Sequence, residues 1–222
     1  MIKAVILDLD DTLFMSFDSA YIVVNMILRE MNARPLARET LAKHWGKPVH
    51  QASKEWGLSV DPEAFAEKFV AHFPVAVQDG VFDILTPENL GALRQLHEQG
   101  KKLFVLTSRV QGELAHLLDP RHELAALIDK FYYKDTMRYH KPDPRAFEHI
   151  EHEHGWRPEE CVYVGDSVGD AMAATGAGLH FIASLESCLR TKNDFSQYKV
   201  EAFLSEFREI GDSVRQLDSR LS

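Results

Sequence analysis

Short runs of apolar residues, each bounded by polar residues, recur along the chain in the manner of buried strands. They cover residues 4–9, 103–106, 162–164 and 179–183, with a weaker run at 131–133. Apolar residues at helical spacing lie between them, as at Leu90, Leu93 and Leu96 ahead of Gly100. Strands that are apolar throughout and alternate with helices are typical of a parallel sheet covered on both faces. The pattern therefore predicts an α/β fold with a Rossmann-like parallel sheet core.

Proline and glycine positions mark the ends of two predicted helices. Residues 87–99 and 144–154 each begin with proline, which is favoured in the first helical turn, and each is followed by a glycine that favours the helix end. Residues 201–221 form a third, amphipathic segment, which we expect to dock on the sheet. Its apolar side would consist of Phe203, Leu204, Phe207 and Ile210.

The first two strands are too far apart in the sequence for a simple crossover. A strand–helix–strand unit takes about 30 residues, but the first strand ends near Leu9 and the second begins near Leu103. The helix at 87–99 can serve as the crossover, and much of the remainder has helical spacing. We therefore expect a small inserted α-helical cap over residues 14–85, and a core domain that comprises residues 1–13 and 86–222.

Composition and charge narrow the class of protein. The chain has 25 Lys and Arg against 34 Asp and Glu, and its net charge of −9 argues against a nucleic-acid partner, because phosphate neutralisation needs a basic face. Cys161 and Cys188 cannot form a disulfide framework, and Cys161 is expected to pack beside a strand. Since no signal peptide and no bilayer-spanning run is found, we expect a cytoplasmic protein with no membrane partner, a monomer or homodimer.

Acidic and hydroxyl side chains follow three of the predicted strands. In chain order they are Asp8, Asp10 and Asp11, then Thr107 and Ser108, then Asp166 and Asp170. Because the carboxyl ends of parallel strands form the ligand crevice of an open sheet, these side chains are expected to converge.

Carboxylates that converge need a positive charge between them. Oxygen ligands without a nearby cysteine or histidine favour Mg²⁺ over zinc. Lys141, in the segment His-Lys-Pro-Asp-Pro, would add a fixed positive charge. The sequence therefore predicts a magnesium site at this edge of the sheet, with a lysine beside it.

Four motifs, in this order, resemble those of the haloacid dehalogenase-like hydrolase superfamily. They are DLDDT at 8–12, Thr107 at a strand end, Lys141 followed by Pro142, and GDSVGD at 165–170. The resemblance is to the phosphatase branch with a helical cap after the first strand, similar to phosphoglycolate phosphatase. It implies an enzyme that hydrolyses a small phosphorylated metabolite with Mg²⁺ as cofactor.

The resemblance also implies a role for each motif residue. Asp8 would attack phosphorus and form an aspartyl-phosphate, while Thr107, Lys141 and the backbone N–H of Ser108 would bind phosphate oxygens. Mg²⁺ would be held by Asp8, the backbone carbonyl of Asp10 and Asp166. Asp170 would be a further ligand, or would orient Asp166 or bound water.

Asp10 distinguishes two branches of the superfamily. It would protonate the leaving oxygen and then take a proton from the attacking water. The dehalogenating branch lacks this acid and needs no metal, so Asp10 favours phosphoryl chemistry over carbon–halogen cleavage. Asp11 stands where many members carry Gly; Asp also occurs there, and it adds charge near the metal.

The expected cap should exclude water and contact the leaving group. Candidates at its entry are Phe14 and Phe17, and candidates further on lie in the segment 44–47. Gly46 and Lys47 stand near the position of a substrate-reading loop in the similar phosphatases.

Several neighbouring residues are open to a purely structural interpretation. Trp45 is as well explained by packing inside the cap, and Lys47 by a surface charge. Arg109 and Arg138 could touch substrate, but we interpret both as exposed arginines.

Three histidines share the predicted helix at 144–154. His149 and His152 are three residues apart, a spacing at which a metal could bind, and His154 follows them. Phe147 and Ile150 take the buried stripe of that helix, so we interpret the histidines as part of a solvated face.

Three functions are compatible with these motifs. The first is a Mg²⁺-dependent phosphatase, and the second is a phosphomutase that passes the same phosphoryl group to another substrate. The third is a non-catalytic phospho-accepting or scaffold protein. Phospho-accepting receivers are shorter and carry no cap, and a degenerate scaffold should lose an aspartate, so we favour the phosphatase. The sequence leaves phosphatase and phosphomutase open.

Overall fold

A computed structural model describes residues 1–221, apart from the side chain of Glu151. Its centre is a parallel sheet with the strand order β3-β2-β1-β4-β5-β6. The strands are β1 (Ala4–Leu7), β2 (Lys102–Leu106), β3 (Lys130–Tyr132), β4 (Cys161–Gly165), β5 (His180–Ser184) and β6 (Ala202–Leu204). This confirms the α/β fold with a parallel Rossmann-like sheet.

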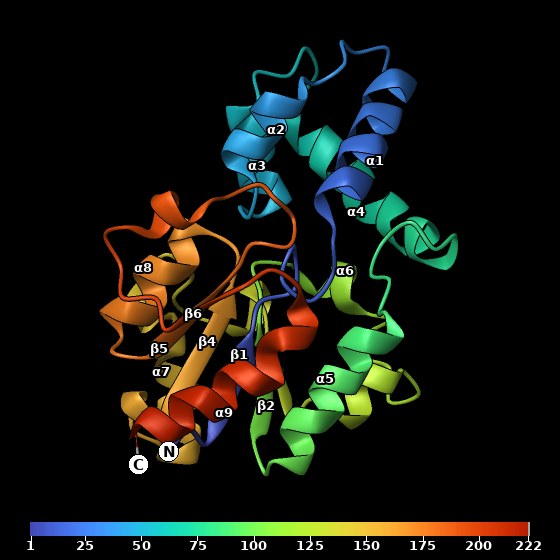
Figure 1. Cartoon of the computed structure of the whole chain (residues 1–222). Helices are drawn as coiled ribbons and strands as arrows, with labels where there is room; N and C mark the ends of the chain where they lie inside the picture. The colour runs from blue at the N-terminus through green and yellow to red at the C-terminus, as the bar shows by residue number, and fades with distance from the viewer. Residues whose placement is uncertain (222) are drawn as a thin grey trace.

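Helices lie on both faces of the sheet and beyond the carboxyl ends of its strands (Figure 1). The α-helices are α1 (Phe17–Glu30), α2 (Arg38–His44), α3 (Val49–Glu55), α4 (Pro62–Gln78), α5 (Pro87–Glu98), α6 (Gln111–Leu114), α7 (Glu148–His154), α8 (Val168–Gly176) and α9 (Ile210–Leu221). Short 3₁₀ helices are η1 (Glu123–Ala126), η2 (Lys134–Thr136), η3 (Pro144–Phe147), η4 (Pro158–Glu160), η5 (Lys192–Phe195) and η6 (Phe207–Glu209). None of the helices within residues 1–221 has the length and apolar character needed to span a bilayer.

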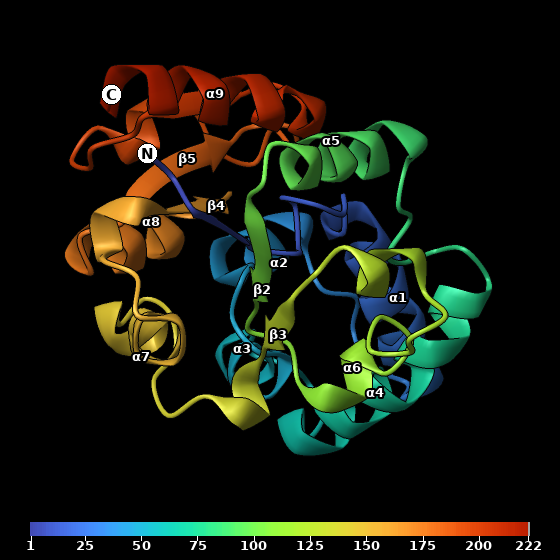
Figure 2. The same cartoon turned by 90° about the horizontal axis from the view of Figure 1, so that it is seen from below.

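The sheet divides the core into two apolar layers. Val5 and Leu7 of β1 belong to the layer beneath α5 and α9, whereas Ala4 and Ile6 belong to the layer beneath α7 and α8. Successive side chains of a strand point to opposite faces, so a strand buried on both faces must be apolar at every position. Figure 2 shows α5 and α9 together on one side of the strands, and α7 and α8 on the other.

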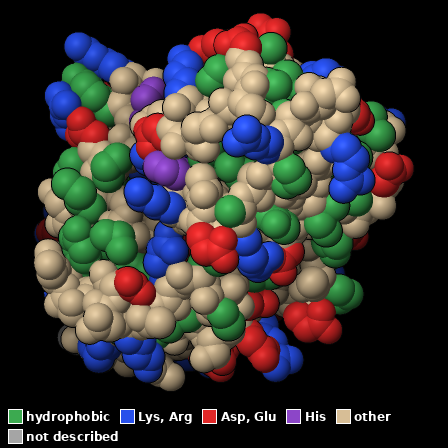
Figure 3. Space-filling view, turned by 90° about the horizontal axis from the view of Figure 1, so that it is seen from above, with side chains coloured by type: hydrophobic (Ala, Val, Ile, Leu, Met, Phe, Trp, Pro, Cys, Tyr) green, Lys and Arg blue, Asp and Glu red, His purple; other side chains and the backbone are tan. Residues whose placement is uncertain are grey.

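Helices α1 to α4 stand beyond the carboxyl ends of the strands and share an apolar cluster of their own (Figure 1). Phe65, Phe69 and Phe73 of α4 form a row at helical spacing, and Phe82 stacks on Phe73 with ring centroids 4.7 Å apart. On their outer surface, acidic and basic side chains are interspersed with hydrophobic ones (Figure 3). The boundaries of the cap at residues 14 and 85 stay a prediction.

Two predicted segments differ from the structure. Residues 202–204 form the edge strand β6, so Leu204 points into the layer of α9 while Phe203 packs against the opposite layer; the expectation that they share one side was wrong. A strand alternates its side chains where a helix would not. The segment that starts at Pro144 forms the 3₁₀ helix η3 before α7 begins at Glu148.

The aromatic row gives a prediction for stability. Phe65 is fully buried, so Phe65→Ala should lower the free energy of unfolding by about 3–5 kcal/mol through lost burial and the cavity left behind. Denaturant unfolding followed by circular dichroism measures this. Val75 lies on the same helix but is 55% exposed, and Val75→Ala should change the value by less than about 0.5 kcal/mol. Equal losses in the two variants would contradict the packing described.

Candidate active site

The carboxyl ends of three neighbouring strands meet at one edge of the sheet. Asp8 follows β1, Thr107 follows β2, and Asp166 follows β4. Backbone hydrogen bonds continue the ladder past the strand ends, from Asp8 N–H to the Val164 carbonyl (2.9 Å) and from Thr107 N–H to the Tyr132 carbonyl (3.0 Å). The strand order reverses around β1, the position where open parallel sheets bind ligands.

Three buried carboxylates lie together at this edge. Asp8, Asp166 and Asp170 each offer one oxygen within 4.8 Å of the others. Burial, together with the charges of Asp170 and Asp8, raises the pKa of Asp166 well above its ordinary value. Within residues 1–221 the Asp166 carboxylate makes neither a hydrogen bond nor an ion pair. An all-oxygen site of like charges is what a hard divalent cation such as Mg²⁺ would neutralise, so the residues present fit such an ion.

Lys141 supplies the positive charge on the other side of this cluster. Its Nζ lies 2.9 Å from Asp8 Oδ1 and 2.8 Å from Asp170 Oδ1, and its side chain is 8% exposed. Burial would lower the pKa of Lys141, but the two carboxylates raise it above its ordinary value. The side chain is therefore a fixed cation, as the sequence predicts.

Tyr163 of β4 completes the cluster and was missed by the sequence analysis. Its hydroxyl accepts a hydrogen bond from Lys141 Nζ (2.7 Å) and lies 3.1 Å from Asp170 Oδ1 and 3.2 Å from the Leu106 carbonyl, to either of which it can donate. A tyrosine within a buried strand needs a hydrogen-bond partner for its hydroxyl, so Tyr163 in the predicted strand could have indicated a polar cluster nearby.

Asp170 is held by the start of helix α8. The backbone N–H and the hydroxyl of Ser167 both donate to Asp170 Oδ2, at 2.9 and 2.6 Å, and the Asp170 N–H donates to the Ser167 hydroxyl. A Cβ on Gly165 would lie 2.6 Å from Asp170 Cγ, so only glycine leaves room for this carboxylate. The spacing of Gly165, Ser167 and Asp170 therefore fixes the position of the Asp170 carboxylate in the cluster.

Asp8 has an electrostatic environment of opposing effects. Burial and the charges of Asp170 and Asp10 together raise the pKa of its carboxyl to about 7, against the lowering effect of Lys141. A cation at the cluster would favour the ionised form. Since Lys141 bonds Oδ1, the other oxygen of Asp8 is the one left for a ligand.

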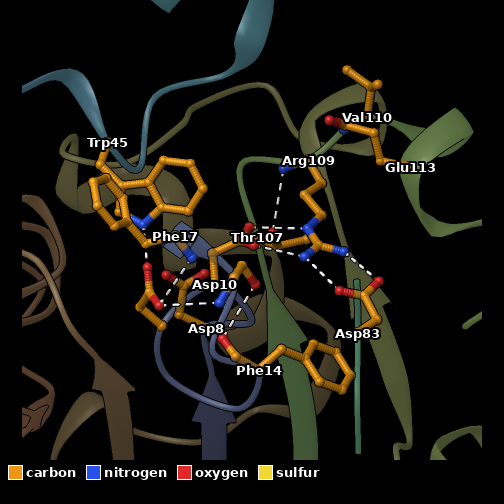
Figure 4. Close-up of polar contacts among 12 residues, drawn as sticks. Asp8, Asp10, Phe14, Phe17, Trp45, Asp83, Thr107, Arg109, Val110 and Glu113 are labelled. Atoms are coloured by element: carbon orange, nitrogen blue, oxygen red, sulfur yellow. Dashed lines mark hydrogen bonds and ion pairs between the residues drawn. The ribbon is translucent and has the colours of Figure 1, made fainter. Parts of the chain in front are cut away.

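The side chain of Asp10 points to a different partner. Arg109 donates from Nε to Asp10 Oδ2 (2.9 Å) and from Nη2 to Asp10 Oδ1 (2.6 Å), and both nitrogens of its outer edge donate to Asp83 (Figure 4). Arg109 is only 6% exposed, so the expectation of an exposed arginine was wrong. The reason is the pair of carboxylates that neutralises it. Neither Asp83 nor this pairing could be read from a motif.

Asp11 and Trp45 join the strand exit to the helices above it. Asp11 adopts a positive φ of 52°, and its Oδ1 accepts from the backbone N–H of Ser16 (3.1 Å) and Phe17 (3.3 Å). The indole N–H of Trp45 donates to the other oxygen. Burial and the charge of Asp10 raise the pKa of Asp11 to about 7. Trp45 thus has a polar contact to the strand exit besides its packing against Phe17.

A cavity of about 330 Å³ opens onto the carboxylate cluster. Asp8, Asp170 and Lys141 line it from below, and the segment 45–48 lines it from the helices above. Arg190, from the loop after β5, stands in its wall and was not singled out from the sequence. A smaller cavity of about 70 Å³ shares the segment 45–48 and is bordered by Asp10, Ser108 and Arg109.

The remaining candidates from the sequence are placed as follows. Gly46 and Lys47 line both cavities, although Lys47 also pairs with Glu55. Thr107 is buried at the end of β2, and its hydroxyl accepts from the backbone N–H of Arg109 (3.2 Å). Phe14 was a candidate for substrate contact, but it is 1% exposed, belongs to the sheet core and lines neither cavity. Phe14 is therefore a packing residue.

Structural interpretations made from the sequence hold at several other positions. His152 and His154 are exposed, and Phe147 and Ile150 are buried, as expected. His149 departs from the expected solvated face, because it is half-buried and its Nε2 is buried without a hydrogen-bond partner among the described residues. Arg138 is exposed and lies over the Tyr139 ring. Cys161 is buried at the start of β4.

The model of the haloacid dehalogenase-like hydrolase family matches residues 5–184. The chain belongs to this family. It is 29% identical over 191 residues to a phosphoglycolate phosphatase of Aliivibrio fischeri, covering 82% of this chain and 83% of that protein. It is also 29% identical over 237 residues to a glyceraldehyde 3-phosphate phosphatase of Methanopyrus kandleri, covering 98% of this chain and 99% of that protein.

Solved structures agree on the fold. A crystal structure described as a predicted phosphoglycolate phosphatase from Haemophilus somnus superposes with a TM-score of 0.79 at 22% identity, over 96% of this chain and 98% of that one. Family membership and the phosphatases among its relatives make this haloacid dehalogenase-like hydrolase a phosphatase, similar to the phosphoglycolate phosphatases.

The carboxylate cluster leads to a prediction for cation binding. Mg²⁺ at about a hundred times its dissociation constant should stabilise the protein by about 2.7 kcal/mol, which raises the melting temperature by about 5–10 °C. Asp166→Asn should abolish this rise, because it removes one of the three carboxylates. Calorimetry with and without Mg²⁺ measures both.

Two further measurements, on metal-free Asp166→Asn and on a surface variant, serve as controls for this test. Metal-free Asp166→Asn should be at least as stable as the parent, since it relieves repulsion between buried carboxylates. Asp212 is exposed on α9, so Asp212→Asn should keep the full Mg²⁺ effect. An unchanged Mg²⁺ effect in Asp166→Asn would exclude the cluster as the site.

Proposed function

We propose that this phosphatase is Mg²⁺-dependent and hydrolyses a small phosphorylated metabolite through an aspartyl-phosphate on Asp8. The observation that carries the proposal is the position of the Asp8 carboxylate, which borders the 330 Å³ cavity beside two carboxylates and one lysine. A buried carboxylate with an unengaged oxygen, a fixed cation and a cation-binding cluster is the set that phosphoryl transfer to a carboxylate requires.

In the first step, the free oxygen of Asp8 attacks phosphorus while the bond to the leaving oxygen breaks. Lys141 holds Asp8 through its other oxygen and offsets negative charge as the phosphoryl group approaches. Thr107 and the backbone N–H of Ser108, at the end of β2, would donate to phosphate oxygens. Asp10, after leaving the Arg109 pair and taking up a proton from water, would give that proton to the leaving oxygen, so that the alcohol departs neutral.

In the second step, Asp10 takes a proton from water, and the oxygen of that water forms a bond to phosphorus. The bond between phosphorus and Asp8 breaks, which restores the carboxylate and releases inorganic phosphate. The proton that Asp10 lost in the first step is thereby replaced, and the enzyme returns to its starting state.

Mg²⁺ held by Asp8, Asp166, the backbone carbonyl of Asp10 and, directly or through water, Asp170 would neutralise phosphate charge and so allow an anionic nucleophile to approach. The protein itself would hold these carboxylates together when the ion is absent. Tyr163, Lys141 and Ser167 support this role, because they bond Asp170 and Asp8 from the protein side.

Residues 14–85 act in this proposal as the cap that closes over the substrate. The segment 45–48 forms a wall of both cavities, and Trp45 ties it to Asp11 beside the nucleophile. A closed cap would exclude water during the first step, which strengthens the electrostatic interactions of Asp8 and Lys141 with the phosphoryl group.

The cavity favours a substrate that carries a second anionic group. Lys47 and Arg190 stand in its wall in addition to Lys141, and the carboxylates that line it, Asp8 and Asp170, are both paired with Lys141. Arg190 donates a hydrogen bond only to the carbonyl of Leu189 and makes no ion pair within residues 1–221, although its charge helps to lower the pKa of Asp194. A carboxylate or second phosphate on the leaving group would supply an ion-pair partner.

A metabolite panel with Asp8→Asn as the blank tests the reaction. Asp8→Asn should release no phosphate above background from any phosphate monoester with Mg²⁺, because the amide is not a nucleophile. Excess chelator should stop the parent enzyme, and added Mg²⁺ should restore it. Phosphate release by Asp8→Asn, or a full rate in chelator, would refute the proposal. Transfer of phosphate to a sugar phosphate in preference to water would favour a phosphomutase instead.

Arg190→Gln tests the preference for a second anion. We expect kcat/KM for 2-phosphoglycolate to fall about tenfold or more, since a charged hydrogen bond of about 1.5–3 kcal/mol is lost. The value for glyceraldehyde 3-phosphate, which has no second anionic group, should change less than about threefold. Lys192 lies two residues away, is exposed and lines neither cavity, so Lys192→Gln is the matched control. Equal losses on both substrates would contradict a role for Arg190 in recognising the second anion.

A further inference from the structure

Arg109 is a buried cation shared by two carboxylates from different parts of the chain. Four of its five N–H groups are engaged, two by Asp10 and two by Asp83, at distances from 2.6 to 2.9 Å. Figure 4 shows its guanidinium between the two acids, with Asp10 on the side of Asp8 and Asp83 on the far side. Its carbon Cζ also lies 5.1 Å from the Phe73 ring of α4, which covers one face of the group.

Asp83 belongs to the linker that runs from α4 to α5. Its side chain is fully buried, and His116 contacts it from the far side at 2.8 Å. Burial alone would raise the pKa of Asp83, but Arg109 and His116 lower it to about 2. The residue is therefore a permanent negative charge, and it holds Arg109 in place independently of Asp10.

The observed pairing engages both oxygens of Asp10. To contact the leaving oxygen of a substrate, the carboxyl of Asp10 must exchange at least one Arg109 contact for the substrate. A guanidinium that is 6% exposed cannot turn to water for compensation, and an unpaired buried charge is strongly unfavourable. Asp83 removes this obstacle, because Arg109 keeps a bidentate partner while Asp10 moves.

We propose that Asp83 is a positioning residue that acts through Arg109 to let the Asp10 carboxyl turn from its resting pair to the substrate. Asp83 touches neither of the two cavities, and no motif marks it. The inference rests on the proposed role of Asp10 in proton transfer. It adds a functional link between that residue and the α4–α5 linker.

Asp83→Asn is the direct test. Asparagine keeps the shape of the side chain and tolerates the positive φ of 57°, but removes the second negative charge. Arg109 would then depend on Asp10 alone and hold it more firmly. Single-turnover release of the alcohol from a phosphate ester of a primary alcohol should slow about tenfold or more, because this leaving group needs the proton from Asp10.

An ester with a good leaving group distinguishes a positioning role of Asp83 from a general loss of activity in the variant. Single-turnover release of p-nitrophenolate from p-nitrophenyl phosphate needs no acid, so Asp83→Asn should change that rate by less than about twofold. Asp79 lies on the same linker, is exposed and contacts neither Arg109 nor Asp10, so Asp79→Asn should leave both rates unchanged. Equal slowing of both esters, or no slowing of either, would overturn the proposal.

The double variant Arg109→Met with Asp83→Asn provides a second, independent test. This variant removes both charges of the Arg109–Asp83 pair from the buried site and releases Asp10 from Arg109. The rate on the alkyl ester should therefore recover relative to Asp83→Asn. A further loss would show that Asp83 is only structural. If Asp83→Asn alone does not fold, the double variant is compared with the parent enzyme instead; a loss confined to the alkyl ester would then contradict the proposal, because Arg109 no longer holds Asp10.

Asp10→Asn distinguishes failure of this inference from failure of the proposed function. It should slow the alkyl ester and spare single-turnover p-nitrophenolate release. If it spares both esters, proton transfer by Asp10 is wrong. If it slows the alkyl ester while Asp83→Asn does not, only the inference about Asp83 is wrong.

Discussion

The structure depends on keeping several negative charges together in a place where water is largely excluded. Parallel strands β1 and β4 end side by side, which brings Asp8 and Asp166 to one point, and helix α8 adds Asp170. Lys141 offsets part of this charge, but burial and the charges of Asp170 and Asp8 still raise the pKa of Asp166 well above its ordinary value. In the proposed function, this unbalanced charge is what a cation would neutralise when it binds together with a phosphoryl group.

The chain maintains this cluster with a tightly fitted protein environment. Tyr163 uses its hydroxyl on Lys141 and Asp170, and Gly165 yields the space that Asp170 occupies. Ser167 caps α8 and holds the same carboxylate. These residues all lie on the sheet or at its edge, so the contacts that hold the carboxylate cluster together come from the sheet and helix α8, whereas the segment 45–48 contributes only the opposite wall of the cavity.

The sequence predicted the parts of this arrangement that depend on local pattern. Continuous apolar runs marked the strands, and acids placed directly after them marked the site, because sheet geometry makes those ends converge. It did not predict Arg109 with Asp83, since 26 residues separate partners that only the packed linker brings together. It also assigned residues 202–204 to a helical face, because three residues are too few to distinguish a period of two from one of 3.6.

The two charged clusters are held by different parts of the chain. The carboxylates around Lys141 are fixed by the sheet, whereas Asp10 is bound to Arg109, which is held by Asp83 of the α4–α5 linker and covered by Phe73 of α4. Trp45 makes a parallel connection from the segment after α2 to Asp11. In the proposed mechanism, phosphate binding would therefore stay constant while a movement of the helices changes the surroundings of Asp10. New leaving groups would then be accepted through changes in the proposed cap alone, provided that the compensated charge at Arg109 is preserved.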